Sequence, residues 1–156
     1  MATAHTLVAG AIAAKVGSPM LALPLALTSH FILDSIPHWD FGTNWRKRTK
    51  TVTGMFAIVD TVVGFTAAYL MFHTRVPSIV LIPSLILSVL PDWLEAPWYI
   101  FYANPNHVGP KDHASLLERL AFRLYKVTNV AHSKAPFPWG LISQILTVTF
   151  FLLLLK

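Results

Sequence analysis

Hydrophobic residues along this chain form long runs that are separated by short polar segments. The first two runs cover residues 5–16 and 20–36, and the Gly-Ser-Pro sequence between them favours a turn. Three further runs follow, at residues 55–72, 78–90 and 137–155. Apolar runs of this length, joined by turns, predict an all-α chain.

Residues 112–127 have a different pattern, because apolar and basic side chains recur there at helical spacing. The pattern predicts an amphipathic helix, and two interpretations of it stay open. The helix lies on an anionic membrane surface, or it packs on the protein itself. The apolar residues are Leu116, Leu117, Leu120, Phe122, Leu124 and Val127, and the basic ones are Lys111, Arg119, Arg123 and Lys126.

Composition indicates a membrane protein rather than a soluble domain. The chain is 54% hydrophobic and 12% charged, and that charged fraction is low for a soluble domain. We therefore predict one integral membrane domain over residues 1–156, an all-α polytopic helical bundle. It contains two repeated helical hairpins, an amphipathic helix and a C-terminal transmembrane helix. Its first helix is rich in alanine and glycine, which lets neighbouring helices approach closely.

Nine of the twelve basic residues fall in two loops, one after the second apolar run and one after the fourth. The positive-inside rule assigns both loops to the cytoplasm. Five crossings then put the N-terminus in the cytoplasm and the C-terminus outside. Because the cations lie between apolar runs, the formal charge of +5 predicts contact with membrane lipids and no nucleic acid.

Two parts of the chain resemble each other, which predicts an internal repeat of about residues 3–41 and 55–96. The sequence Ile32–Trp39 aligns with Ile86–Trp93, and both contain Pro-x-Trp. Each unit would be a helical hairpin that ends in a turn carrying His38 or Asp92. An interfacial segment at about residues 97–136 and a terminal span at about 137–155 complete the domain.

Ionisable residues are concentrated at the end of the second run. His30 and Asp34 are four residues apart, so they share one face of a helix. Pro37 ends or bends that helix and leaves His38 and Asp40 in the following turn. Ionisable groups inside apolar segments are costly and usually mark function. The stretch therefore predicts a functional site.

Histidine and carboxylate side chains in this pattern indicate a metal site. The chain has no cysteine, so nitrogen and oxygen must supply the ligands. We expect one or two divalent ions, with Zn as the first choice and Mn or Fe as alternatives. Asp34 or Asp40 would serve as the catalytic base. The candidate ligands are His5, His30, Asp34, His38, Asp40, Asp60 and Asp92, with His132 and Glu95 as additional candidates.

Simpler interpretations of these residues stay open. His30 and Asp34 would also suit a buried hydrogen-bonded pair that holds two helices together. Asp92 would suit a helix cap, and Glu95 an exposed turn residue. Asp60 is the hardest to explain in this way, because it is the only charged residue in the apolar run 55–72.

The early His5, the Pro37-His38-Trp39-Asp40 turn and the later His132-Ser133 pair resemble the YdjM-like family of membrane-bound metal-dependent hydrolases. The resemblance implies a bacterial or archaeal inner-membrane protein with a His/Asp metal site. In that family the turn is closer to Leu-Pro-Asp-x-Asp, whereas here His38 replaces the first Asp. The second copy at Pro91-Asp92 lacks the second Asp.

Together these features predict metal-dependent hydrolysis near the cytoplasmic face, with a phospholipid or phosphoester as the substrate. The alternative is a membrane protein that is not an enzyme and uses the same cluster for structural metal binding or for ion transport. Catalysis requires an open coordination position, whereas a structural site has a closed shell. The sequence leaves the oligomeric state undetermined.

Overall fold

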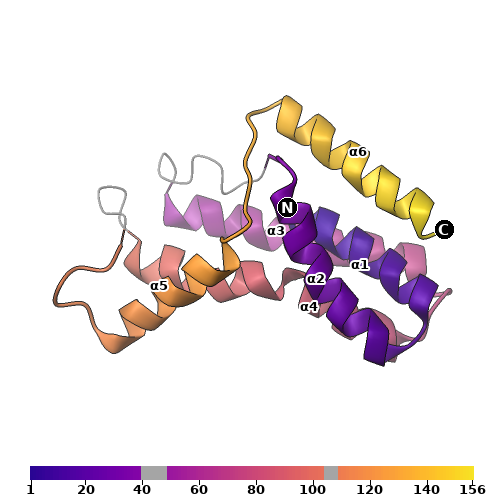
Figure 1. Ribbon diagram of the computed structural model, residues 1–156, viewed down its shortest axis with the longest axis horizontal. Coiled ribbons are helices and arrows are strands. Elements are labelled where there is room, and N and C mark those ends of the chain that lie inside the picture. The colour runs from indigo at the N-terminus through magenta and orange to yellow at the C-terminus, as the bar shows by residue number, and fades with distance from the viewer. Residues whose placement is uncertain (40–48, 104–108) are drawn as a thin grey trace.

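The computed structural model describes residues 1–39, 49–103 and 109–156 (Figure 1). Every regular element in these ranges is helical, which confirms the all-α class for the described part of the chain. The elements are α1 (Ala2–Val16), α2 (Pro19–Ser35), α3 (Lys50–Phe72), α4 (Ser78–Pro97), η2 (Trp98–Tyr102), α5 (Leu116–Thr128) and α6 (Trp139–Leu154).

Helix α1 lies at the centre of the bundle and contacts α2, α3, α4 and α6. Most of its residues are buried, from Ala2 through Ala13. A helix that is covered on most sides needs apolar residues all around rather than one apolar stripe. The alanine-rich sequence of α1 meets this need and keeps the helix slim.

Glycines allow α1 and α3 to touch. A Cβ at Gly64 would lie 2.6 Å from Oγ1 of Thr6, and a Cβ at Gly10 would lie 2.5 Å from the Phe72 ring. Neither position has room for a side chain. Since early residues of α1 meet the middle of α3 and later ones meet its end, the two helices run in the same direction.

Two helices begin at residues that the sequence pattern did not predict. Helix α3 begins at Lys50 instead of residue 55, because Thr49 caps it by accepting a hydrogen bond from Val52 N at 3.3 Å. Helix α5 begins at Leu116 instead of residue 112, and Ser115 accepts a hydrogen bond from Glu118 N at 3.2 Å. Both caps satisfy backbone N–H groups that a helix start leaves without partners.

Helix α4 is longer than predicted, and the predicted turn after residue 90 is wrong. The chain stays helical through Pro91 to Pro97 and continues as the π-helix η2. A proline inside a helix removes one N–H donor but does not end the helix when packing holds both sides. Of the two Pro-x-Trp sequences, only the one at Pro37 lies outside a helix. The internal repeat itself stays a prediction.

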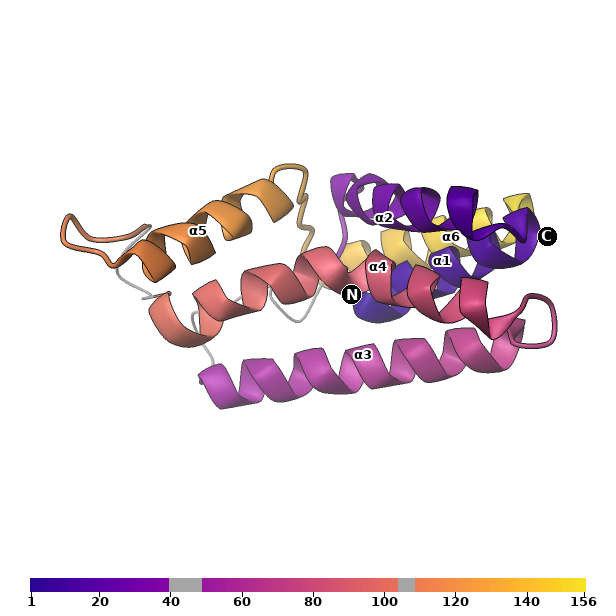
Figure 2. The ribbon, with the colours of Figure 1, turned by 90° about the horizontal axis from the view of Figure 1, so that it is seen from below.

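The first half of α3 and the second half of α4 extend beyond the central bundle, where α5 lies against α4 (Figure 2). An aromatic core joins these elements. Trp98 of η2 packs against Phe122 and Tyr125 of α5, with ring centroids 4.7 and 6.1 Å apart. This region forms an aromatic lobe, which we define as η2, α5 and the parts of α3 and α4 beside them.

Helix α6 returns along the bundle and packs on α1 and α2. Val148 and Phe151 contact a small core of Val8, Ile12 and Leu33. At the start of α6, a Cβ on Gly140 would lie 2.5 Å from Trp39 N. The beginning of α6 is therefore held directly against the turn that follows α2.

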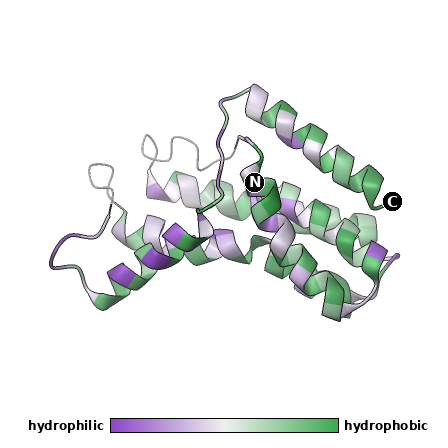
Figure 3. Cartoon of the chain, in the orientation of Figure 1, coloured by the Kyte–Doolittle hydropathy of each residue, from purple (hydrophilic) through white to green (hydrophobic). Residues whose placement is uncertain are grey.

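Two helical segments are long and apolar enough to cross a membrane, namely Lys50–Phe72 and Ser78–Tyr102. Helices α1 and α6 are apolar but shorter, at 15 and 16 residues. Figure 3 shows hydrophobic residues along all of these helices, whereas hydrophilic residues gather on α5 and the segment before it.

Candidate metal centre

His30 and Asp34 share a face of α2, as their spacing predicted. The Nε2 atom of His30 lies 3.1 Å from Oδ2 of Asp34, and both side chains are buried. On its other side, the His30 ring places Nδ1 2.8 Å from the carbonyl oxygen of Ser88 in α4.

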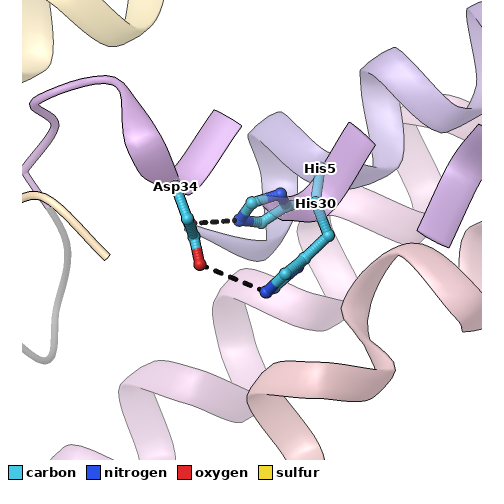
Figure 4. Close-up of side chains that lie close together, drawn as sticks. All are labelled: His5, His30 and Asp34. Carbon is cyan, nitrogen blue, oxygen red and sulfur yellow. Dashed lines mark ion pairs between the residues drawn. The ribbon is translucent and has the colours of Figure 1, made fainter. Parts of the chain in front are cut away.

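Helix α1 adds His5 to this pair. Its Nε2 atom lies 3.2 Å from Oδ1 of Asp34, and its ring stacks on His30 with centroids 4.2 Å apart. Figure 4 shows both rings directing a nitrogen atom toward the Asp34 carboxylate. The exposed fraction of these three side chains is only 1–2%.

Two more histidines approach Asp34 from the side where α2 ends. His38 lies with Nε2 3.7 Å from Oδ1 of Asp34, and His132 lies with Nδ1 3.6 Å from Oδ2. Their rings stack with centroids 4.9 Å apart. The Nδ1 atom of His38 is 2.9 Å from the carbonyl oxygen of Ile36.

Backbone pairing explains how His132 reaches the cluster. The segment between α5 and α6 runs beside the turn after α2, where Ser133 N donates to Asp34 O at 2.8 Å. His38 N donates to Ser133 O at 3.2 Å, and Ala135 N donates to His38 O at 2.8 Å. These three bonds fix His132 next to Asp34, although almost a hundred residues separate them in sequence.

The five side chains form two groups that share Asp34. The first group is His5, His30 and Asp34, and the second is Asp34, His38 and His132. In each group the candidate ligand atoms all lie within 4.8 Å of one another. Three ligands from His and Asp at this separation match the donor set of catalytic zinc sites.

The hydrogen bonds of two rings fit a bound cation. Because Nδ1 of His30 and Nδ1 of His38 each face a carbonyl oxygen, each of these nitrogens carries the proton. A neutral ring then directs the lone pair of Nε2 toward the negative Asp34 carboxylate. A cation between them removes this repulsion. Histidine ligands of metals typically donate their other N–H to a backbone carbonyl in this way.

Charge balance excludes the state in which all four rings are protonated. Four imidazolium ions around one buried carboxylate would repel each other, most of all in the two stacked pairs. Burial lowers the pKa of His38, so this ring is neutral at pH 7. The two Asp34 oxygens lie 3.2 and 3.1 Å from Nε2 of His5 and His30, so a proton on either ring would pair with the carboxylate. A carboxylate has about four lone-pair positions, so these oxygens can also bind a cation.

The remaining candidate ligands lie in different places. Asp92 is at the edge of the cluster, with Oδ1 3.9 Å from His30 Nε2 and the side chain 31% exposed. Glu95 accepts a hydrogen bond from Asn129 and belongs to neither group. Asp40 lies outside the described residues.

Asp60 binds the start of α1 instead of joining the cluster. Its carboxylate accepts hydrogen bonds from Ala2 N at 2.6 Å, Thr3 N at 3.3 Å and Thr3 Oγ1 at 2.6 Å. A carboxylate suits this position, because the first N–H groups of a helix lack partners and carry partial positive charge. Asp60 thereby fixes the turn of α1 that carries His5.

A small cavity of ≈ 10 Å³ adjoins the cluster. Its lining includes His5, Asp34 and His38 of the cluster, together with Gln144 and Thr147 of α6. This volume holds about one water molecule. The sequence interpretation missed Gln144, although an amide in an apolar helix was a signal. Its Oε1 atom is buried and has no hydrogen-bond partner among the described residues.

No protein-family profile, curated protein or solved structure matches this chain. The resemblance to the YdjM-like family therefore stays a prediction, and the functional argument depends on the geometry of the site.

Proposed function

We propose that this protein is a membrane-embedded, metal-dependent hydrolase whose divalent cations are held at Asp34. The supporting observation is the set of four imidazole rings around one buried carboxylate, arranged as two groups that share it. We assign one cation to His5, His30 and Asp34, and a second to Asp34, His38 and His132. Zn is the first choice for this donor set, with Mn or Fe as alternatives.

A divalent cation in such a site acts as a Lewis acid and lowers the pKa of bound water to near neutrality. Asp34 faces histidine rings, so we assign it to cation binding. Asp92 is partly exposed at the edge of the cluster, and we assign proton transfer to it. The cavity beside Gln144 has room for the attacking water.

The proposed substrate is a phosphoester carried by a lipid. Large apolar side chains are exposed on α3 and α6, including Val59 and Val62 of α3 and Leu146 and Phe150 of α6. Such surfaces suit contact with acyl chains. We place the protein in the cytoplasmic membrane with its N-terminus and basic loops in the cytoplasm, because cations concentrate in those loops.

Phosphate release tests the hydrolase proposal. Purified full-length protein in detergent micelles is loaded with Zn²⁺ or Mn²⁺ and assayed on p-nitrophenyl phosphate esters and phospholipids. We expect the rate of hydrolysis to fall in Asp34→Asn by more than roughly 10–100-fold, which is the loss typical of mutating a residue that only supports a metal ligand. The exposed His73 at the end of α3 supplies the matched control, since His73→Ala keeps full activity. A metal-loaded protein that hydrolyses none of these substrates would contradict the proposal.

A structural metal site is the second candidate, and the burial of the first group favours it. His5, His30 and Asp34 are almost completely enclosed, as in closed structural sites. Azide added to the Co²⁺-loaded protein separates the two candidates. An open catalytic position gives a change in the visible spectrum, and a closed shell gives none.

A further inference from the structure

Helix α5 uses only one of its faces to pack on the protein. Ala121 and Thr128 are buried, and Phe122 and Tyr125 lie against the Trp98 ring. These four residues follow helical spacing and form a single stripe. The aromatic lobe therefore accounts for one face of α5. The other two faces are largely exposed, although Arg119 donates hydrogen bonds to the carbonyl oxygens of Asp112 and Ala114 and Lys126 lies over the Phe122 ring.

A second face of α5 is an exposed apolar stripe, formed by Leu116, Leu120, Leu124 and Val127. The side chains are exposed by 73%, 44%, 42% and 66%, and their spacing places them on one side of the helix. Leu117 lies beside them and is also largely exposed. An isolated exposed leucine needs no explanation, but a continuous stripe of this kind marks an interaction surface.

The third face is a basic stripe of Arg119, Arg123 and Lys126, all exposed. Each of these residues directly precedes a member of the apolar stripe, so the two stripes are about 100° apart around the helix. Together with Glu118, the three cations give α5 a net charge of +2, from three positive charges and one negative. Figure 3 shows both hydrophilic and hydrophobic patches on this helix.

We infer that α5 docks on an anionic lipid bilayer, with the apolar stripe in the acyl-chain boundary and the basic stripe at the headgroups. Apolar and cationic faces that adjoin on one short helix are the features that bind such interfaces. Arg and Lys stems extend toward headgroups while their charges stay in water. The surface potential of anionic lipids attracts each cation, which strengthens partitioning by about fivefold per charge.

A second copy of this chain fits the surface less well. An antiparallel twofold contact through the apolar stripes would bring the two basic stripes side by side, and their charges would repel. An anionic bilayer satisfies both faces at once. This inference is independent of the metal site, because it uses the exposed faces of α5 and no residue of the His/Asp cluster.

Spin labels test the inference, since the chain contains no cysteine and single-cysteine variants are unambiguous. Full-length protein carrying Leu120→Cys, Arg123→Cys or Thr74→Cys is labelled and reconstituted in vesicles of phosphatidylcholine with 30% phosphatidylglycerol. A label that is accessible to oxygen lies in lipid, and a label that is accessible to a water-soluble nickel complex lies in water. Position 74 lies in the exposed turn after α3 and serves as the water-facing control.

We expect the label at position 120 to be more accessible to oxygen, and the labels at positions 123 and 74 to be more accessible to nickel. Replacing Arg119, Arg123 and Lys126 by glutamine in the Leu120→Cys background should shift its label toward nickel accessibility, whereas Arg75→Gln should not. Nickel accessibility at 120 in the anionic vesicles would overturn the inference. Shielding from both reagents with spin–spin broadening would instead identify a second copy, and an unchanged triple variant would refute the role of the charges.

Discussion

At the scale of single residues, Asp34 organises the site because four histidine rings each direct a nitrogen atom toward its buried carboxylate. The nitrogen atoms of His30 and His38 that face Asp34 carry lone pairs, since their other nitrogens face carbonyl oxygens. A buried carboxylate beside lone pairs needs a positive charge, which either a bound cation or a proton on one of the rings supplies. Asp34 and its histidines therefore fit a metal centre, and the metal content of the protein separates it from a protonated hydrogen-bond network.

The sequence predicted some of these residues and not others. The four-residue spacing was enough to pair His30 with Asp34, because helix geometry alone fixes that relation. Asp60 was a candidate ligand because a lone carboxylate in an apolar run is costly. In the structure, the Asp60 carboxylate instead accepts hydrogen bonds from N–H groups at the start of α1. This is a tertiary contact, which no local sequence pattern reveals.

Gln144 provides a prediction at this scale, for the Co²⁺-loaded protein. Its Oε1 atom lines the cavity and has no hydrogen-bond partner among the described residues, so it would stabilise a bound water more than hydroxide. Gln144→Leu should keep the metal content and lower the pH midpoint of the visible spectrum. The expected fall is about 0.5–1 unit, since one hydrogen bond contributes about 0.5–1.5 kcal/mol. Ser143→Ala is the control, and an unchanged midpoint in Gln144→Leu would remove Gln144 from the site.

At the scale of elements, the position of each helix end decides which side chains meet. The predicted ends were least accurate where a cap or an interior proline was involved. The cap at Thr49 starts α3 earlier than predicted, and the cap at Ser115 starts α5 later than predicted, each through one side-chain hydrogen bond. The sequence predicted that the helix ends at Pro91, yet α4 continues past it, and Asp92 lies beside His30. Packing against neighbours decides such cases, and sequence spacing does not include it.

Asp60 gives the prediction at the element scale. Asp60→Ala leaves N–H groups of the first α1 turn without acceptors, so stability should fall by about 1–2 kcal/mol. Metal affinity should fall about 10–100-fold, because His5 loses its support. Asp60→Asn retains an acceptor oxygen and should recover most of both. Denaturant titration and metal competition measure these effects. If Asp60→Asn instead lost an entire equivalent of metal, Asp60 would be a ligand after all.

At the scale of the whole molecule, the cluster forms where several helix ends meet. The start of α1, the end of α2 and the segment before α6 all lie there. The charge pattern predicted this common side, because alternating crossings bring these ends together. It did not predict that α3 and α4 continue past the cluster to form the aromatic lobe. That arrangement depends on the contacts of Trp98 with α5.

Cysteine labelling in cells tests the predicted topology. His113 and Thr74 are both exposed and lie in segments that the charge pattern assigns to opposite sides. We expect a membrane-impermeant maleimide to label Thr74→Cys in intact cells. His113→Cys should react only after the membrane is permeabilised. Labelling of His113→Cys in intact cells would show that the basic loops do not face the cytoplasm.

The most direct test of the central claim is the metal content of the purified full-length protein, measured by elemental analysis. We predict two divalent ions per chain in the wild type and in His73→Ala, and one in either His5→Ala or His132→Ala. Asp34→Asn should contain none, while its helical circular dichroism stays unchanged. A wild-type protein without stoichiometric metal, or an Asp34→Asn variant that keeps its full content, would contradict the account.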